Sequence, residues 1–449
     1  MDAPTSILLG VPLLVTAFLA NRRWRKEVPI RGARLATHDP LRRLLWRLRA
    51  KSGDSLTLAG KPICQLDETK HFKMIGTTGT GKSTAIRELL AAALARGDRA
   101  VIADPEGGYC RQFFDPWRGD RVLNPFDSRS VRWAPLAEIH ELGDPEHLAG
   151  ALVATSADPG ASEWRGYARA FVSAVLERCQ AIPGCDTSEL WRLIAIASAA
   201  ELRPLLAGTP AQPFLDADNS RMFGSLRAIA VSAMRPLEFV QWQTGTAFSV
   251  REWVRHGRGV LFIPYSARQI AALKTLISTW VGLAIFEALS QQENHDQRLW
   301  FVVDELDALG TIDGLRDALT RLRKFGGRCV LGFQSIAQVS STYGAGDAQT
   351  IVENCGNTLI LRCSGSENGG TSQYASRLIG DREVLRRQRS NGRDGAGLFA
   401  SGSRRSIQIS EQRMVEPALL AAQVEQLPDL CGYLKTASSP LWHEVRLGR

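Results

Sequence analysis

Short apolar runs alternate with longer stretches of helical periodicity along most of the chain. The apolar runs are bounded by turn or cap residues, which is typical of buried parallel strands. We expect strands at residues 72–76, 100–104, 259–264, 299–304, 328–333 and 358–363. Helical spacing follows most of these runs, at residues 83–96, 267–290, 314–325 and 347–354. This alternation predicts an α/β fold with a doubly wound, parallel sheet.

The pattern changes between the second and third expected strands. Residues from about 135 to 244 contain no strand-like run, and helical spacing is clearest at residues 147–156, 162–181, 187–199 and 220–237. Pro and Gly breaks separate these helices. We therefore expect an all-helical domain at residues 136–244, inserted into an α/β core. The two parts of that core would cover residues 56–135 and 245–449.

The N-terminal residues have a different character. An apolar run at residues 6–20, extended back to Ala3, gives roughly 27 Å of helix against a ~30 Å hydrocarbon core. Eleven Lys and Arg but only two acids follow between residues 22 and 51, so this segment carries the whole net charge of +9. A secretory signal has its positive charge before the apolar run.

The charge order predicts a single-pass membrane anchor at the N-terminus. We expect a transmembrane helix at residues 1–21 and a basic juxtamembrane segment at residues 22–55 that faces anionic lipid. The positive-inside rule leaves the bulk of the chain in the cytoplasm. A helix that lies on the membrane surface or packs inside protein is the alternative.

The overall composition is that of a folded globular protein. Of 449 residues, 44% are hydrophobic and 22% are charged, which excludes a disordered tail, a fibrous repeat and a polytopic membrane protein. The eight cysteines contain no C-x-x-C pair and the seven histidines no paired spacing. We therefore expect reduced thiols and no zinc site.

A complete phosphate-binding loop follows the first expected strand. Residues 76–83 read G-T-T-G-T-G-K-S and open a helix, which is the context that the motif requires. Lys82 would reach the β- and γ-phosphates of ATP, and the Ser83 hydroxyl would ligate Mg²⁺. We expect the nucleotide to be held by the loop and the first helical turn, namely Gly76, Thr77, Thr78, Gly79, Thr80, Gly81, Lys82, Ser83 and Thr84.

A second motif, W-F-V-V-D-E, places two acids at the end of an apolar strand. Asp304 would hold Mg²⁺, through water, and Glu305 would orient and deprotonate the attacking water. An exposed acidic turn is the alternative for this motif taken alone. Together with the phosphate loop, the Asp-Glu pair favours a nucleotide hydrolase over a metabolite kinase.

Two further features fit a motor protein. The strand at residues 328–333 is followed by Gln334, whose amide could sense the γ-phosphate or cap the next turn. Arg321, Arg323 and Lys324 cluster on the preceding helix. One of these arginines could act as a finger in a neighbouring subunit's site, and an exposed basic helix face is the alternative.

In their order along the chain, these stretches resemble the coupling proteins of bacterial conjugation and type IV secretion, the TraD- and TrwB-type ATPases. The matching segments include MIGTTGTGKSTAIRELL, GDRAVIADPEGG, SEWRGYAR, LWFVVDELDALG and LPDLCGY. The resemblance implies a RecA-like P-loop core with an inserted helical domain, assembled as a homo-hexamer under the inner membrane. Such an ATPase moves single-stranded DNA with its relaxase to the secretion channel. Lys82, Ser83, Asp304 and Glu305 match the nucleotide and magnesium residues, Gln334 the sensing glutamine and Arg323 the finger position.

The resemblance leaves several points open. Members usually carry two transmembrane helices, and residues 1–21 supply one. Arginines at residues 386–405, in an expected mobile loop or hairpin, could contact DNA or be merely solvated. Trp164, Tyr167 and Phe171 follow helical spacing, which favours core packing over base stacking. A membrane docking protein that uses ATP as an assembly switch, and a related DNA pump for chromosome segregation, are the competing functions.

Overall fold

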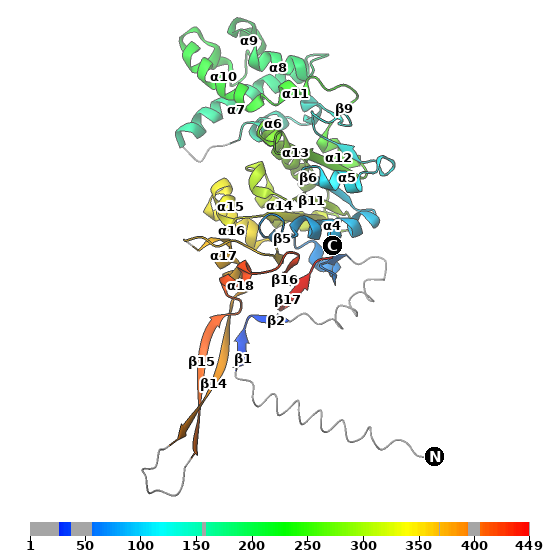
Figure 1. Cartoon of the computed structure of the whole chain (residues 1–449). Helices are drawn as coiled ribbons and strands as arrows, with labels where there is room; N and C mark the ends of the chain where they lie inside the picture. Colours follow the sequence, from blue (N-terminus) through cyan, green and yellow to red (C-terminus); the bar gives the residue numbers. More distant parts are fainter. Residues whose placement is uncertain (1–26, 37–55, 155–158, 368, 394–404, 449) are drawn as a thin grey trace, which may run out of the picture.

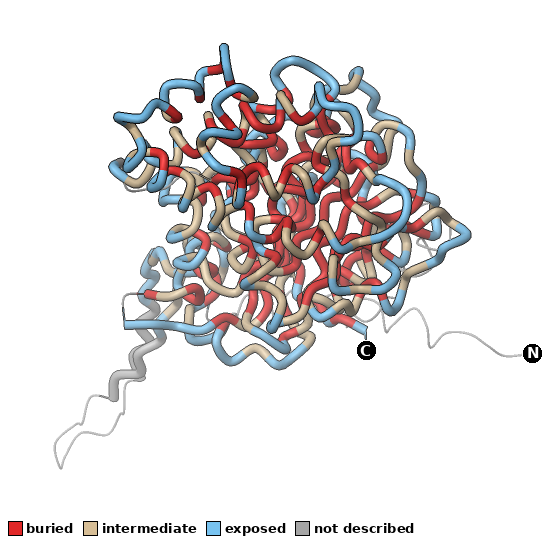
Figure 2. The backbone as a smooth tube through the Cα atoms, turned by 90° about the horizontal axis from the view of Figure 1, so that it is seen from above, coloured by how far each residue is buried: buried red, intermediate tan, exposed pale blue. Residues whose placement is uncertain are grey.

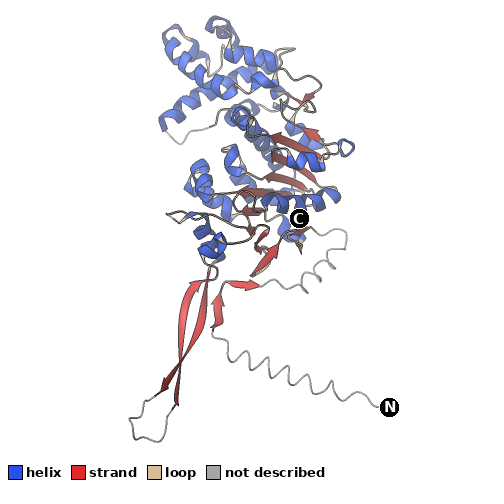
Figure 3. Ribbon diagram, viewed as in Figure 1, coloured by secondary structure: helices blue, strands red, loops and turns tan. Residues whose placement is uncertain are grey.

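A ten-stranded mixed sheet forms the centre of the molecule (Figures 1 and 3). The structure is a computed structural model that describes residues 27–36, 56–154, 159–367, 369–393 and 405–448. In order across the sheet, the strands are β2 (Arg34–Ala36), β17 (Leu441–Arg446), β16 (Cys431–Lys435), β13 (Asn357–Ile360), β5 (Phe72–Ile75), β12 (Gly327–Phe333), β11 (Leu299–Val303), β6 (Arg99–Pro105), β10 (Val260–Tyr265) and β7 (Arg121–Val122). All six strands expected from the apolar runs lie in this sheet.

The sheet is parallel from β13 to β7, and its two faces are covered by different helices. Alternate residues of β6 show this, because Val101 and Ala103 belong to one buried cluster and Ala100 and Ile102 to the other. The first cluster contains α13 (Ile270–Ser290) and the second contains α4 (Lys82–Ala95). Burial on both faces explains why these strands read as continuous apolar runs. Figure 2 shows the resulting buried interior.

The sheet is not parallel throughout, because antiparallel pairs occur at one edge. β16 pairs with β13 and β17 in antiparallel fashion, and β2 closes the edge parallel to β17. The residues of β16 alternate between buried and half-buried positions. Because one face of this edge is only partly covered, its strands lack the apolar runs that mark the centre of the sheet.

α13 is the one helix, among the described residues, that is long and apolar enough to cross a membrane. However, 61% of its apolar window is buried inside the protein. Its residues Ile277, Trp280 and Ala284 are fully buried in the core cluster. α13 is therefore a core helix. The transmembrane anchor predicted at residues 1–21 lies outside the described residues.

Shorter helices make up the rest of the sheet region. They are α5 (Gly108–Phe113), α12 (Val250–His256), α14 (Leu315–Arg321), α15 (Ile336–Tyr343), α16 (Ala345–Glu353), α17 (Gly370–Ile379) and α18 (Ala421–Glu425). The helix expected at residues 314–325 is α14 followed by the 3-10 turn η6 (Leu322–Phe325). A short helix α3 (Gln65–Glu68) and the two-residue strands β3 (Thr57–Leu58) and β4 (Lys61–Pro62) precede β5.

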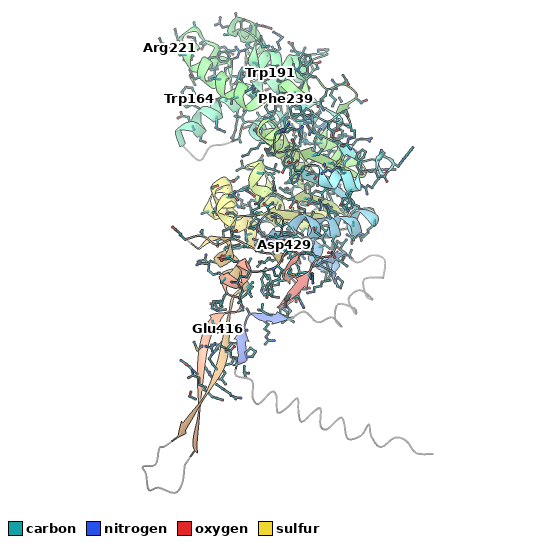
Figure 4. All side chains as sticks on the ribbon, in the orientation of Figure 1. Trp164, Trp191, Arg221, Phe239, Glu416 and Asp429 are labelled. Carbon is teal, nitrogen blue, oxygen red and sulfur yellow. The ribbon has the colours of Figure 1, made fainter. Side chains whose placement is uncertain are left out.

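Helices fill most of the far end of the molecule, at the top of Figure 1. They are α6 (Asp144–Leu152), α7 (Pro159–Ala181), α8 (Thr187–Ala195), α9 (Ala199–Leu205), α10 (Ser220–Met234) and α11 (Leu237–Val240). Phe171 is fully buried between α7 and α10, where its ring meets Phe223. Trp164, labelled in Figure 4, is 37% exposed and packs edge-on against Tyr167. Core packing is therefore confirmed for Phe171, and Trp164 lies at the surface.

Buried charges join these helices to the sheet region. The chain enters and leaves through two paired strands, β8 (Arg132–Trp133) and β9 (Ala247–Phe248). Arg251 on α12 is 2% exposed and forms ion pairs with Asp144 on α6 (2.6 Å) and Glu287 on α13 (2.9 Å). It also donates to the Glu138 carbonyl (2.8 Å). This Arg251 network links an element of the helical end to the core helix.

A separate three-stranded sheet extends away from the body (Figures 1 and 3). It consists of β1 (Glu27–Gly32), β14 (Asp381–Arg393) and β15 (Arg405–Pro417). Of the expected loop or hairpin at residues 386–405, the described part is thus a hairpin. Arg386 forms ion pairs with Glu27 (2.8 Å) and with Glu416 (3.3 Å), the residue labelled on this sheet in Figure 4.

Candidate nucleotide-binding site

The phosphate loop connects β5 to α4 at the carboxyl edge of the central sheet. Gly79 and Gly81 have φ of 78° and 116°, a backbone conformation that side chains disfavour. The loop is held by its neighbours, because Thr77 N donates to the Arg362 carbonyl (2.9 Å) and Leu430 N donates to the Thr80 carbonyl (2.9 Å). Both partners belong to later parts of the chain, so the loop conformation depends on the completed fold.

Lys82 lies folded back against this loop. Its ammonium group donates to the carbonyls of Gly76 (2.6 Å) and Thr77 (3.3 Å), and the residue is only 7% exposed. Burial lowers the pKa of Lys82, while the nearby carboxylates of Asp304 and Glu305 act in the opposite direction. A buried ammonium group at the N-terminus of a helix, beside a glycine-rich loop, is an arrangement that favours an anion such as phosphate.

Asp304 follows β11 and points toward the first turn of α4. Its Oδ2 accepts hydrogen bonds from the Ser83 hydroxyl (2.6 Å) and from the Tyr109 hydroxyl (2.7 Å). Its Oδ1 is buried and has no hydrogen-bond partner in the part of the chain that the structure describes. A buried carboxylate oxygen left without a donor, next to a serine hydroxyl, fits Mg²⁺ or its water ligands. Ser83 and Asp304 are therefore the residues that could hold the metal.

Glu305 is connected to the phosphate loop through Gln334. The Gln334 amide donates to the Glu305 carboxylate (3.4 Å), and the Thr78 hydroxyl donates to the Gln334 carbonyl oxygen (2.9 Å). Burial raises the pKa of Glu305, with a further rise from the neighbouring Asp304 and Asp307. A carboxylate of raised pKa is a stronger general base than an ordinary glutamate. This chain of contacts joins the expected base, the expected sensor and the loop.

Arg323 does not lie at this site. It is exposed in η6, before the first residue of β12, whereas Gln334 follows the last residue of the same strand. Seven strand residues span roughly 20 Å, so Arg323 lies at the amino ends of the parallel strands and Gln334 at their carboxyl ends. The structure therefore brings together Lys82, Ser83, Asp304, Glu305 and Gln334, but leaves Arg323 apart from them in its own chain.

Sequence reasoning missed Asp104 and Tyr109. Asp104 is the next-to-last residue of β6, is fully buried and accepts hydrogen bonds from the backbone N–H groups of Tyr109 (3.1 Å) and Cys110 (2.7 Å). Burial raises the pKa of Asp104 to about 6. An acid at the end of a buried strand was the available signal, as it was for Asp304. Nothing in the sequence placed the Tyr109 hydroxyl on the Asp304 carboxylate.

The closing segment of the chain also reaches the site. Asp429 forms an ion pair with Arg362 (2.6 Å), and the Arg362 carbonyl in turn accepts from the loop. Asp429 is labelled in Figure 4. Its neighbour Leu430 has φ of 63° and packs where a Gly81 side chain would lie. The L-P-D-L motif therefore supports the phosphate loop.

Comparisons with known proteins show what the whole chain is similar to. The family model for the type IV secretion-system coupling protein DNA-binding domain matches residues 55–448. The coupling protein TraD of Escherichia coli K12 is 28% identical over 441 residues, which is 95% of this chain and 60% of TraD. The chain thus spans about 60% of the length of this curated relative.

Solved structures of the conjugative coupling protein TrwB show the same architecture. The unbound TrwB structure is 31% identical, with a TM-score of 0.80 over 94% of this chain and 93% of that chain. TrwB in complex with ADP and Mg²⁺ is 30% identical, with a TM-score of 0.80 and coverage of 94% of both chains. From the match over residues 55–448 and this shared architecture, the chain belongs to the family of type IV secretion-system coupling proteins.

Proposed function

We propose that this chain is the coupling ATPase of a conjugative DNA transfer or type IV secretion system. It binds ATP with Mg²⁺ and uses hydrolysis to deliver single-stranded DNA with its bound relaxase to the secretion channel. The observation that carries this proposal is the hydrogen bond between Ser83 and Asp304. It joins the segment that contains Lys82 to the segment that contains Glu305. The complex of TrwB with ADP and Mg²⁺ supports the choice of ligand.

Each residue of the site has a separate role in binding ATP or in its hydrolysis. Loop N–H groups and Lys82 bind the phosphates, and on binding Lys82 exchanges its two carbonyl partners for phosphate oxygens. Ser83 and Asp304 hold Mg²⁺, which neutralises charge on the β- and γ-phosphates when bound. Glu305 orients a water molecule and accepts its proton, for which a raised pKa is favourable. Gln334 senses the γ-phosphate because it bridges Glu305 and the loop.

The wider organisation is part of the same proposal. We place a helical domain at residues 136–244 within a core formed by residues 56–135 and 245–449, anchored in the inner membrane by residues 1–21. A homo-hexameric ring brings Arg323 of one subunit to the site of the next, since Arg323 lies at the opposite sheet edge from its own site. Relaxase, channel proteins and single-stranded DNA are the partners.

ATP turnover tests the proposal. The full chain in detergent micelles is assayed with and without single-stranded DNA, beside Lys82→Ala. We expect turnover that rises with DNA and is lost in the variant. ATP binding without turnover under every DNA condition would instead indicate a docking protein for which ATP is an assembly switch.

DNA transfer between cells provides the second test. Glu305→Gln is expected to abolish transfer while leaving assembly intact, because it removes the base but keeps the side-chain shape. Glu353→Gln, an exposed glutamate on α16, is the matched control and is expected to transfer normally. Normal transfer by Glu305→Gln would refute the motor and its assigned base.

A further inference from the structure

Asp304 is held in one orientation by a residue outside the motifs that define the site. Its Oδ2 accepts two hydrogen bonds, from Ser83 (2.6 Å) and from Tyr109 (2.7 Å). Its Oδ1 accepts none from the described residues, although it is buried. The two oxygens of one carboxylate are thus distinguished by their surroundings. Rotation of the carboxylate would break both bonds, so Oδ2 is kept toward Ser83, the other residue that could hold the metal.

Contacts of its backbone and its ring hold Tyr109 in place. Tyr109 is 1% exposed and lies on α5, whose first N–H groups are accepted by Asp104 at the end of β6. The guanidinium of Arg87, on α4, lies 5.5 Å from the centre of the Tyr109 ring. β6 is adjacent to β11, which precedes Asp304. Rigid elements on both sides therefore set the distance between the hydroxyl and the carboxylate.

We propose that Tyr109 is a positioning residue for magnesium binding, acting through Asp304. The inference rests on the proposed ATPase function and deepens it. Tyr109 makes no described hydrogen bond to Lys82, and its hydroxyl lies beside the Ser83 side chain as well as the Asp304 carboxylate, so its effect on the metal passes through the residues that would hold it. Hydrogen-bond partners that orient a metal ligand usually contribute 10- to 100-fold to metal affinity. Because Ser83 still donates a hydrogen bond to the same oxygen, we expect the loss of Mg²⁺ affinity to lie at the lower end of this range, about 10-fold.

The variant Tyr109→Phe isolates the hydroxyl, because phenylalanine fills the same buried space. Binding of a fluorescent ATP analogue to the full chain is measured as a function of free Mg²⁺ and in the presence of EDTA. We expect Tyr109→Phe to need about 10-fold more Mg²⁺ for half-maximal enhancement of binding, with unchanged binding in EDTA. Tyr374→Phe, a half-buried tyrosine on α17, is the control and is expected to match the unaltered protein.

Turnover supplies a second readout. At saturating Mg²⁺, the rate for Tyr109→Phe is expected to return to that of the unaltered protein, since the hydroxyl contacts no reacting atom. A Mg²⁺ requirement within 2-fold of the unaltered protein would overturn the role of Tyr109 and leave the ATPase function standing. Failure of the unaltered protein to bind the analogue with Mg²⁺ would overturn both.

Discussion

Removal of the Arg251 guanidinium is expected to loosen the helical end of the molecule from the core. In Arg251→Met, Asp144 and Glu287 lose their shared buried partner; their side chains are 6% and 2% exposed. Removing one member of a buried ion pair typically costs about 3–5 kcal/mol, because the remaining charge stays buried.

The surroundings of Arg251 place the cost at the lower end of this range. Glu287 keeps an ion pair with Arg255, and Asp144 keeps the backbone N–H groups of His140 (2.7 Å) and Glu141 (2.8 Å). We therefore expect about 3 kcal/mol, which is on the order of a 100-fold increase in the local opening equilibrium.

Hydrogen–deuterium exchange measures this opening directly. The amides of α6 and α12 are expected to lose on the order of 100-fold protection in Arg251→Met. The control is Arg192→Met on α8, whose partners Glu189 and Glu201 are 38% and 45% exposed, and whose loss should cost no more than about 1 kcal/mol. Nucleotide binding should be retained, because Arg251 does not touch the phosphate loop. A change in protection below about 5-fold would refute the reasoning.

Three further predictions concern the site and its support. Burial lowers the pKa of His71 to about 4, so the unfolded chain binds more protons than the folded chain between pH 6.5 and pH 4. The free energy of unfolding therefore falls by roughly 3 kcal/mol as the pH drops from 6.5 toward 4, and this contribution is complete above pH 6.5. Urea titrations should find a smaller dependence of the unfolding free energy on pH in His71→Asn. Equal slopes in both proteins would contradict this. Gly81→Ala is expected to weaken ATP binding more than Gly79→Ala in equilibrium titrations. A Cβ at Gly81 meets Leu447 at 2.8 Å, whereas nothing lies within 4 Å of a Cβ at Gly79. Similar losses in the two variants would show that backbone strain alone, which both positions share, determines the loss of affinity. Mixed rings of Lys82→Ala and Arg323→Ala subunits should regain turnover that neither variant has alone, since intact sites form between unlike neighbours, and no recovery would argue against a finger acting between subunits.

The sequence by itself determined the central sheet and the main residues of the site. Buried parallel strands read as apolar runs, and their carboxyl ends lie at one edge of a sheet, so Lys82, Ser83 and Asp304 could be placed together from local patterns alone. The helices at the far end of the molecule could also be predicted, because helical periodicity is a local property.

Only the tertiary structure decided what holds those residues in place. The Tyr109 hydroxyl reaches Asp304 across 195 residues of sequence, and no local pattern records which of the six tyrosines will do so. The edge formed by β16, β17 and β2 depends on pairing between chain ends, as between Leu441 and Arg34, and its partly covered face leaves no continuous apolar run. The opposite placement of Arg323 and Gln334 likewise follows from the direction of β12 in the sheet. Long-range pairing and strand direction, rather than periodicity, therefore set these features.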